Sequence, residues 1–325
     1  MPMLTQQIPA RTPAIQRSRL MLEAVSELVG ANEWRDKQVM IYMRPQGDAK
    51  WRTKFYASDG PDSIDMVMSG EADIAICNPG GVLGMAFKGK GPFKKPLPLR
   101  SIMVMPQFDQ LGFAVHPKTG LKTLGDLKRQ KYPLRVSLRG QPDHSVHFIV
   151  NHVLSAFDMT LDDIKSWGGK VVYTEGMPNG PDRLGAVERG ELDAVWDEAL
   201  PRFAKEAIQL GMKFLPVDEP ELKKLESDGL MRAAITDQEY PGLGPDVWTV
   251  DFSGWPVFCL ETASDDMVYK FCEAVDARRA LIPWEESGGQ PLPTEKLCKD
   301  SKEGPLYLPL HPAAERYWRD RGYLK

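Results

Sequence analysis

Short apolar runs, typical of buried strands, alternate with longer amphipathic runs along nearly the whole chain. This alternation constrains the fold strongly, because it predicts parallel sheets whose strands are joined by crossover helices. The strand-like runs are residues 38–43, 72–77, 99–105, 111–115, 134–138, 170–173, 192–196, 212–216 and 255–260. The helical runs are residues 13–29, 61–69, 121–130, 142–157, 181–189, 200–210, 220–227, 265–279 and 312–321. We therefore expect an α/β protein.

The order of these runs predicts two lobes. A chain of 325 residues exceeds one ordinary core and suits two domains of roughly 100–200 residues each. The last strand-like run, residues 255–260, follows two complete α/β blocks and most simply returns to the first one. We predict one lobe of residues 1–107 and 250–325, a second of residues 108–249, and a ligand cleft between them at the carboxyl ends of the strands.

Composition excludes several partners. The chain is 42% hydrophobic and 26% charged with a net charge of −4, so no global field attracts nucleic acid or an anionic membrane. No apolar run approaches the ~20 residues that a bilayer span needs. The first residues, MPMLTQQ, carry neither the basic nor the apolar segment of a signal peptide, which predicts a cytoplasmic protein as the sequence stands and a periplasmic one if an export signal was removed.

Cysteine usage and nucleotide motifs are also informative. The four cysteines, Cys77, Cys259, Cys272 and Cys298, are far apart and form no CxxC pair, so we expect buried free thiols rather than a zinc site or a disulfide framework. The chain contains no GxGxxG after its first strand-like run, no GxxxxGK[ST] and no GxSxG. A nucleotide cofactor and an α/β-hydrolase mechanism therefore have no support.

Residues 135–147 predict an anion site. This segment has the pattern of a buried strand that passes through a glycine turn directly into a helix. The unpaired N–H groups and the dipole of a helix N-terminus attract negative charge. Arg139, Gln141, His144 and Ser145 lie at the same point in the sequence, so we expect a small organic anion, such as a carboxylate, to bind there.

Further candidate ligand-binding residues come from other strand ends and loops. Arg44 and Gln46 follow the first strand-like run, Asn78 follows the second, and Arg11 lies in the first loop. An arginine fork in this position binds a carboxylate in a bidentate manner or forms a surface ion pair, and an asparagine binds a ligand or caps the next helix.

Asp197 and Glu198 follow the strand-like run 192–196 and suggest acid–base chemistry. Adjacent residues at a strand end point in opposite directions, so we do not expect them to work as a carboxylate pair. One of them is expected to meet His144 or Arg139 across the floor of the cleft. His144 and Glu198 are the candidate catalytic residues if the cleft has enzymatic activity.

A metal site is the alternative for the same residues. His144 and His147 are one helical turn apart and share a face, and with Glu198 or Asp197 they would form a site of two histidines and one carboxylate. We favour no cofactor, and a divalent metal such as zinc or iron is the alternative.

Three segments resemble one family in order along the chain. Residues 69–76 (SGEADIAI), 120–128 (GLKTLGDLK) and 188–194 (ERGELDA) resemble the solute-binding proteins of the TAXI group of TRAP transporters. More broadly, the chain looks like the type II periplasmic-binding fold, which also includes thiamine-pyrimidine and aromatic-decarboxylase relatives. The resemblance implies a two-lobed receptor that closes on a solute and, if exported, works with transporter membrane subunits. The glycine- and serine-rich loops of the family are replaced here at residues 44–52 and 139–145.

Two functional classes follow. The first is a receptor or sensor that binds a small organic anion, including an aromatic acid, between the lobes. The second is a cytosolic lyase or decarboxylase of the same fold that uses histidine and acidic residues in the cleft. Fold alone does not choose between them.

Overall fold

The computed structural model describes residues 13–30, 38–43, 52–58, 60–142, 144–281 and 293–325. It divides into two compact units, Met1–Val39 and Met40–Lys325. Helix α1 (Pro13–Gly30) belongs to the first unit. Among the described residues, no helix combines the length and the apolar character that crossing a bilayer requires.

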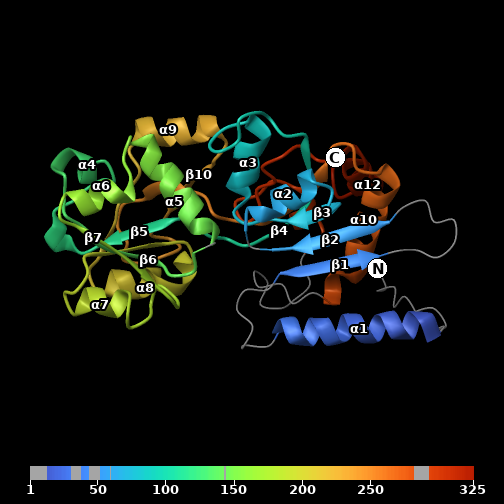
Figure 1. The fold of residues 1–325 in the computed structure, drawn as a ribbon, viewed down its shortest axis with the longest axis horizontal. Helices are drawn as coiled ribbons and strands as arrows, with labels where there is room; N and C mark the ends of the chain where they lie inside the picture. The colour runs from blue at the N-terminus through green and yellow to red at the C-terminus, as the bar shows by residue number, and fades with distance from the viewer. Residues whose placement is uncertain (1–12, 31–37, 44–51, 59, 143, 282–292) are drawn as a thin grey trace. The chain divides into compact units, whose positions relative to one another are not determined.

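The first sheet has the strand order β1-β2-β3-β12-β4 (Figure 1). Its strands are β1 (Val39–Met43), β2 (Thr53–Ala57), β3 (Ile74–Ile76), β4 (Leu99–Met105) and β12 (Trp255–Leu260). Strands β2 and β3 are parallel, whereas β12 pairs antiparallel with both β3 and β4. Residues 256–259 of β12 are all buried, so both faces of this strand are covered, which explains its run of apolar residues.

The second sheet has the order β7-β6-β8-β5-β9. Its strands are β5 (Gly112–Val115), β6 (Arg135–Arg139), β7 (Lys170–Thr174), β8 (Ala194–Asp197) and β9 (Lys213–Phe214). Strand β6 is parallel to β7 and β8, and β5 is antiparallel to β8 and β9. The carboxyl ends of β6 and β8 therefore lie side by side, which brings Arg139 close to Asp197.

The two sheets share one plan. In each, an antiparallel strand is inserted before the edge strand. Strand β5 follows β4 of the first sheet, and β12 follows the two-stranded ribbon of β10 (Arg232–Ile235) and β11 (Val247–Val250). The predicted α/β class and type II binding fold are confirmed. The predicted lobe boundaries, residues 1–107 with 250–325 and residues 108–249, stay a prediction.

The helices connect the strands and cover the sheets. After α1, the helical elements are α2 (Asp62–Met68), α3 (Gly80–Lys88), η1 (Pro117–Thr119), α4 (Asp126–Gln130), α5 (Ser145–Ala156), α6 (Leu161–Ser166), α7 (Leu184–Glu188), α8 (Leu200–Gln209), α9 (Glu219–Asp228), α10 (Asp265–Arg278), η2 (Arg279–Leu281), α11 (Glu295–Cys298) and α12 (Pro312–Asp320). Figure 1 shows α5 and α6 on one face of the second sheet and α7 and α8 on the other.

Several elements differ from the sequence-based expectation. Strand β2, helix α6 and the β10–β11 ribbon were not expected, and α3 was expected only as a helix after Asn78, without bounds. Helix α3 contains three glycines and is buried nearly throughout, so it lacks the polar face that identifies an amphipathic helix. Helix α4 begins at Asp126 rather than at residue 121, because the Asp126 carboxylate accepts hydrogen bonds from the N–H groups of Lys122 and Thr123 and holds them in a turn.

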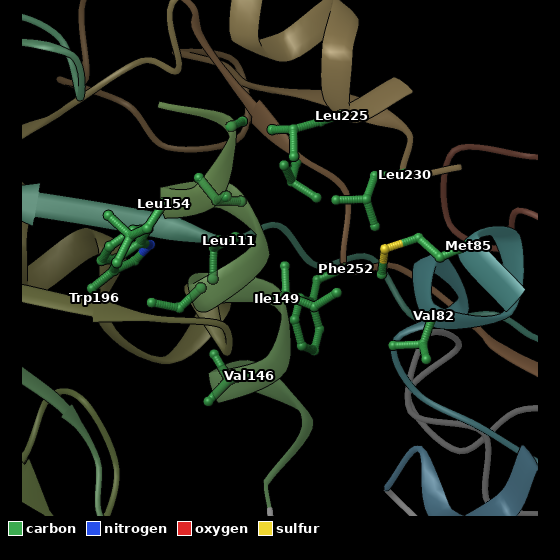
Figure 2. Close-up of a cluster of buried hydrophobic side chains, with 14 of the residues drawn as sticks. Val82, Met85, Leu111, Val146, Ile149, Leu154, Trp196, Leu225, Leu230 and Phe252 are labelled. Carbon is green, nitrogen blue, oxygen red and sulfur yellow. The ribbon is translucent and has the colours of Figure 1, made fainter. Parts of the chain in front are cut away.

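One hydrophobic core links the helices of the two sheets. Figure 2 shows Val82 and Met85 of α3 together with Phe252, Leu230 and Ile149, all of which are buried. This shared core explains why residues 40–325 form one compact unit. The four cysteines are buried free thiols, as predicted.

Candidate functional site

A cavity of about 260 Å³ lies at the carboxyl ends of β6 and β8. It is bounded from the first sheet by the segment after β3, by the chain that leaves β4, and by the start of β12, and from the second sheet by the ends of β6 and β8 and the first turn of α8. The lining residues are Asn78, Gln107, Asp109, Arg139, His144, Met177, Glu198, Ala199, Pro201, Arg202 and Trp255.

Arg139 is the centre of the polar network at this cavity. Its Nε and Nη2 atoms donate to Asp197 Oδ1 at 3.2 and 2.9 Å, and Nη2 also forms an ion pair with Glu198 Oε1. Asp197 and Glu198 therefore contact the same guanidinium group. The expectation that they point apart was wrong, because β8 ends at Asp197 and the backbone turns at Ala199, which has a left-handed φ of 60°.

Asp197 lies beneath Arg139 and a second arginine that sequence analysis missed. The Arg183 side chain is fully buried, donates from Nε to Ser137 Oγ at 3.0 Å, and pairs through Nη1 with Asp197 Oδ2. Two guanidinium groups thus hold one fully buried carboxylate. Asp197, predicted as a ligand-binding residue, supports Arg139 from below and does not line the cavity.

His144 is the N-cap residue of α5. Its Nδ1 accepts a hydrogen bond from the Val146 N–H at 3.1 Å, which caps the helix. Nε2 lies 3.0 Å from Arg139 Nη1 and 3.6 Å from Glu198 Oε1. Burial and the neighbouring Arg139 charge lower the pKa of His144 to about 3, so the ring is neutral at pH 7.

This cap corrects the predicted start of the helix. Helix α5 begins at Ser145 and not at Pro142, and the capping acceptor is the His144 ring. The Ser145 hydroxyl group is buried and has no hydrogen-bond partner among the described residues.

Glu198 and Asp109 form a pair of buried carboxyl groups. Asp109 accepts hydrogen bonds from the N–H groups of Gln110, Ala199 and Leu200 at 2.8, 2.9 and 2.9 Å, and so caps the N-terminus of α8. Burial and then the nearby Glu198 raise the pKa of Asp109 well above its usual range. Burial also raises the pKa of Glu198 to about 7, although the Arg139 charge opposes this shift. Two buried carboxyl groups this close disfavour ionisation of both at once.

The network contains two guanidinium groups, those of Arg139 and Arg183, and three carboxyl groups, those of Asp197, Glu198 and Asp109. The positive charge of Arg139 is therefore already paired when an anion enters the cavity, because Glu198 occupies the side of the guanidinium group that faces the cavity.

The remaining predicted site residues do not all line the cavity. Asn78 lines the cavity, and its amide nitrogen donates to the carbonyl groups of Phe252 and Gly254 at 3.3 and 3.0 Å. Gln141 and His147 contact each other through the Gln141 carbonyl oxygen and His147 Nε2 at 2.9 Å and are not among the lining residues.

The predictions for Arg11, Arg44 and Gln46 lie outside the described residues. In the described part of the chain, no group of three or more His, Cys, Asp or Glu side chains is arranged to hold a metal ion. The alternative site of His144, His147 and Glu198 stays a prediction.

Trp255 supplies an apolar wall to the cavity. The indole Nε1 donates to Gln107 Oε1, and this bond fixes the ring at the start of β12. Met177, from the loop after β7, also lines the cavity. The cavity thus combines the Arg139–Glu198 pair and other polar groups with the apolar surfaces of Trp255 and Met177, a lining that suits a small organic molecule with a polar and an apolar end.

Comparison with known proteins identifies the family of this chain. The sequence profile of the NMT1-like family matches residues 39–322. Similar solved structures include the unliganded, open L-cystine solute receptor of Neisseria gonorrhoeae, with 13% identity over 72% of this chain and 75% of the receptor and a TM-score of 0.29. A glycine betaine/L-proline-binding protein of an ABC transporter from Borrelia burgdorferi has 14% identity over 64% of each chain and a TM-score of 0.34. A protein of Bordetella bronchiseptica has 14% identity over 82% of this chain and 69% of its own, with a TM-score of 0.37.

Proposed function

Because this chain belongs to the NMT1-like family, we propose that it is a solute receptor that binds a small organic acid, as its carboxylate, in the cavity at Arg139. The observation that supports this proposal is the pairing of Arg139 Nη2 with Glu198 Oε1 at the cavity surface. A carboxylate already sits on the guanidinium group in this arrangement, so the site has the geometry to accept the carboxylate of a ligand instead.

The cavity dimensions limit the ligand. A volume of about 260 Å³ lies slightly below the range of roughly 300–1,000 Å³ that is common for drug-sized ligands. We therefore propose an acid with few heavy atoms. Trp255 and Met177 would cover its apolar part, and this environment accommodates a small aromatic ring as well as an alkyl chain.

We also propose the transport system to which the receptor belongs. The three motifs that resemble the TAXI group favour a receptor of a TRAP transporter, whose partners would be the membrane subunits. Binding to such subunits would require the protein to be exported, and a cytosolic copy of the same site would act as a sensor.

A lyase or decarboxylase is the second candidate. One observation favours it: Glu198, a carboxyl group with a pKa of about 7, lines the cavity beside the neutral His144. A carboxyl group that titrates near neutral pH is suited to general acid–base catalysis.

A ligand screen with a matched variant tests the proposal. Small mono- and dicarboxylates, including acetate, benzoate and succinate, are added to the full chain, and both the thermal midpoint and the chemical fate of the acid are measured. We expect Arg139→Ala to weaken binding by about 1.5–3 kcal/mol, the usual value of a charge-assisted hydrogen bond. Arg135→Ala is the control, because Arg135 pairs with Asp193 at the opposite end of the same strand.

The outcomes separate the alternatives. An acid that stabilises the wild-type and Arg135→Ala proteins, binds weakly to Arg139→Ala, and is recovered intact supports a receptor. An acid that is consumed supports the enzyme. Equal binding by both variants would show that Arg139 has only a structural role.

A further inference from the structure

We propose that each carboxylate bound in the cavity is accompanied by one proton, which Glu198 accepts when the ligand takes its place on Arg139. This inference rests on the proposed function and adds a pH dependence to it. Proton uptake would make Glu198 the residue that sets the affinity of the site at alkaline pH.

The geometry explains why Glu198 is the group displaced. Two carboxylates contact Arg139 Nη2, but they differ in exposure and in support. Asp197 is fully buried and is also held by Arg183, so it has no path away from the network. Glu198 lines the cavity, and its side chain retains about 12% of its exposed surface. A ligand that approaches Arg139 from the cavity therefore meets Glu198 first.

The groups around Glu198 determine what happens to its charge when a ligand displaces it from Arg139. Charged and titratable groups approach it from β6, from β8, from the segment after β4, from the caps of α5 and α7, and from the first turn of α8. These groups are Arg139, Asp197, Asp109, His144, Arg183 and Arg202.

Arg139 is the closest cation to Glu198, while Asp197 and Asp109 are close carboxyl groups. When the ligand occupies Arg139, Glu198 loses its ion-pair partner and gains a negative neighbour. An ionised Glu198 would then lie in a buried site beside three other carboxyl groups, counting that of the ligand.

Protonation removes this conflict. The proton comes from solvent. The neutral Glu198 carboxyl group can then donate a hydrogen bond to the ligand carboxylate. The charge of the network stays unchanged, because one negative charge enters with the ligand and one positive charge enters with the proton. His144 is not the acceptor, because its Nδ1 already accepts from Val146 and its Nε2 faces the Arg139 charge.

This mechanism predicts a specific pH profile. In the free protein the pKa of Glu198 is about 7, so below pH 7 the proton is already bound and affinity does not change with pH. Above pH 7 each ligand must bring a proton with it. The dissociation constant is then expected to rise about tenfold for each pH unit, up to the higher pKa of Glu198 in the complex.

Calorimetry measures the proton directly. Acetate and benzoate, which are both ionised in this range, are titrated into the full-length protein at pH 6, 7.5 and 9, in pairs of buffers with different ionisation enthalpies. We expect the wild type to take up close to one proton per carboxylate at pH 9 and close to none at pH 6. Glu198→Gln, which keeps the shape but not the charge, should take up none and should bind about 100-fold more tightly than wild type at pH 9.

Glu191→Gln is the matched control. Glu191 also pairs with an arginine, Arg189, but at the amino end of β8 and on the exposed surface. It should behave like the wild type at every pH.

The outcomes distinguish this inference from the proposed function. Binding without proton uptake, and with the same flat pH profile in wild type and Glu198→Gln, would overturn the inference and leave the receptor intact. If neither acid binds to either protein, the receptor and the inference both fail. Proton uptake by the wild type tests the inference even if Glu198→Gln does not fold.

Discussion

Arg183 and Asp197 form an ion pair from which solvent is excluded on both sides, with the two side chains 1% and 0% exposed. Asp197 is the last residue of β8, and Arg183 is the N-cap residue of α7, so the pair joins the carboxyl end of a central strand to a helix that covers the sheet. Because Asp197 also holds Arg139, this pair fixes the floor of the cavity.

Breaking this pair should be costly. Arg183→Ala would leave the Asp197 carboxylate buried with only one of its two cations, and we expect the free energy of unfolding to fall by about 3–5 kcal/mol. Urea denaturation at pH 7 measures this loss. Arg189→Ala is the control, because Arg189 follows the same helix but forms its ion pair with Glu191 on the exposed surface, where such pairs contribute about 0–1 kcal/mol. Similar small losses for the two variants would contradict the buried role of Arg183.

Some of this site follows from the sequence alone. The hydrophobic runs located β6 and β8 to within two residues, and Arg139 and Asp197 end these strands. Parallel neighbouring strands place such residues at the same edge of a sheet, so the predicted meeting of Arg139 with an acidic residue after β8 is confirmed. The bounds of β4 and β12 were predicted correctly, because both are mostly apolar over six or seven residues.

The rest of the network depends on tertiary contacts. Arg183 belongs to a surface-like sequence, PDRLG, and nothing in its neighbours indicates that the side chain is buried. Asp109 was missed because it caps α8, a helix far along the chain, so local sequence does not suggest its role. The ribbon of β10 and β11 was missed because its strands have only four residues each and a long connection separates them.

Histidine protonation should make stability depend on pH. The pKa of His144 is lowered from 6.5 to about 3 in the folded protein, so the folded state favours the neutral ring. The associated stability is fully present above pH 6.5 and is lost as the pH falls toward 3. The loss is about 1.4 kcal/mol per pH unit, or about 3 kcal/mol between pH 7.5 and 4.5. His144→Asn keeps a side chain that can cap α5 but removes the titrating ring. In urea denaturation, this variant should therefore lose less stability than the wild type between pH 7.5 and 4.5.

A second capping histidine provides the control. His116 accepts the N–H of Lys118 at 3.1 Å, the same i to i+2 bond that His144 makes with Val146, but it caps a 3-10 turn at a partly exposed position. His116→Asn therefore measures the effect of changing the cap alone. If His144→Asn and wild type lose stability in parallel from pH 7.5 to 4.5, His144 is not held neutral by its surroundings.

Gly84 and Gly229 give the last prediction, which concerns the packing of α3 against the end of α9. A Cβ atom on Gly84 would lie 2.1 Å from the Gly229 carbonyl oxygen, and this obstacle is backbone that cannot rotate away. Gly84→Ala must therefore separate the two segments and disturb the core that they share. We expect a loss of about 1–3 kcal/mol in the free energy of unfolding, despite the better helix propensity of alanine. Gly185→Ala in α7 is the matched control and should be neutral or slightly stabilising, because the one tight contact of its Cβ would be the flexible end of Arg189 at 3.3 Å, and Gly180 and Pro181 lie at an ordinary 3.8 Å. Thermal and urea denaturation of both variants provide the measurement, and a Gly84→Ala protein as stable as wild type would show that α3 and α9 do not depend on this close backbone contact.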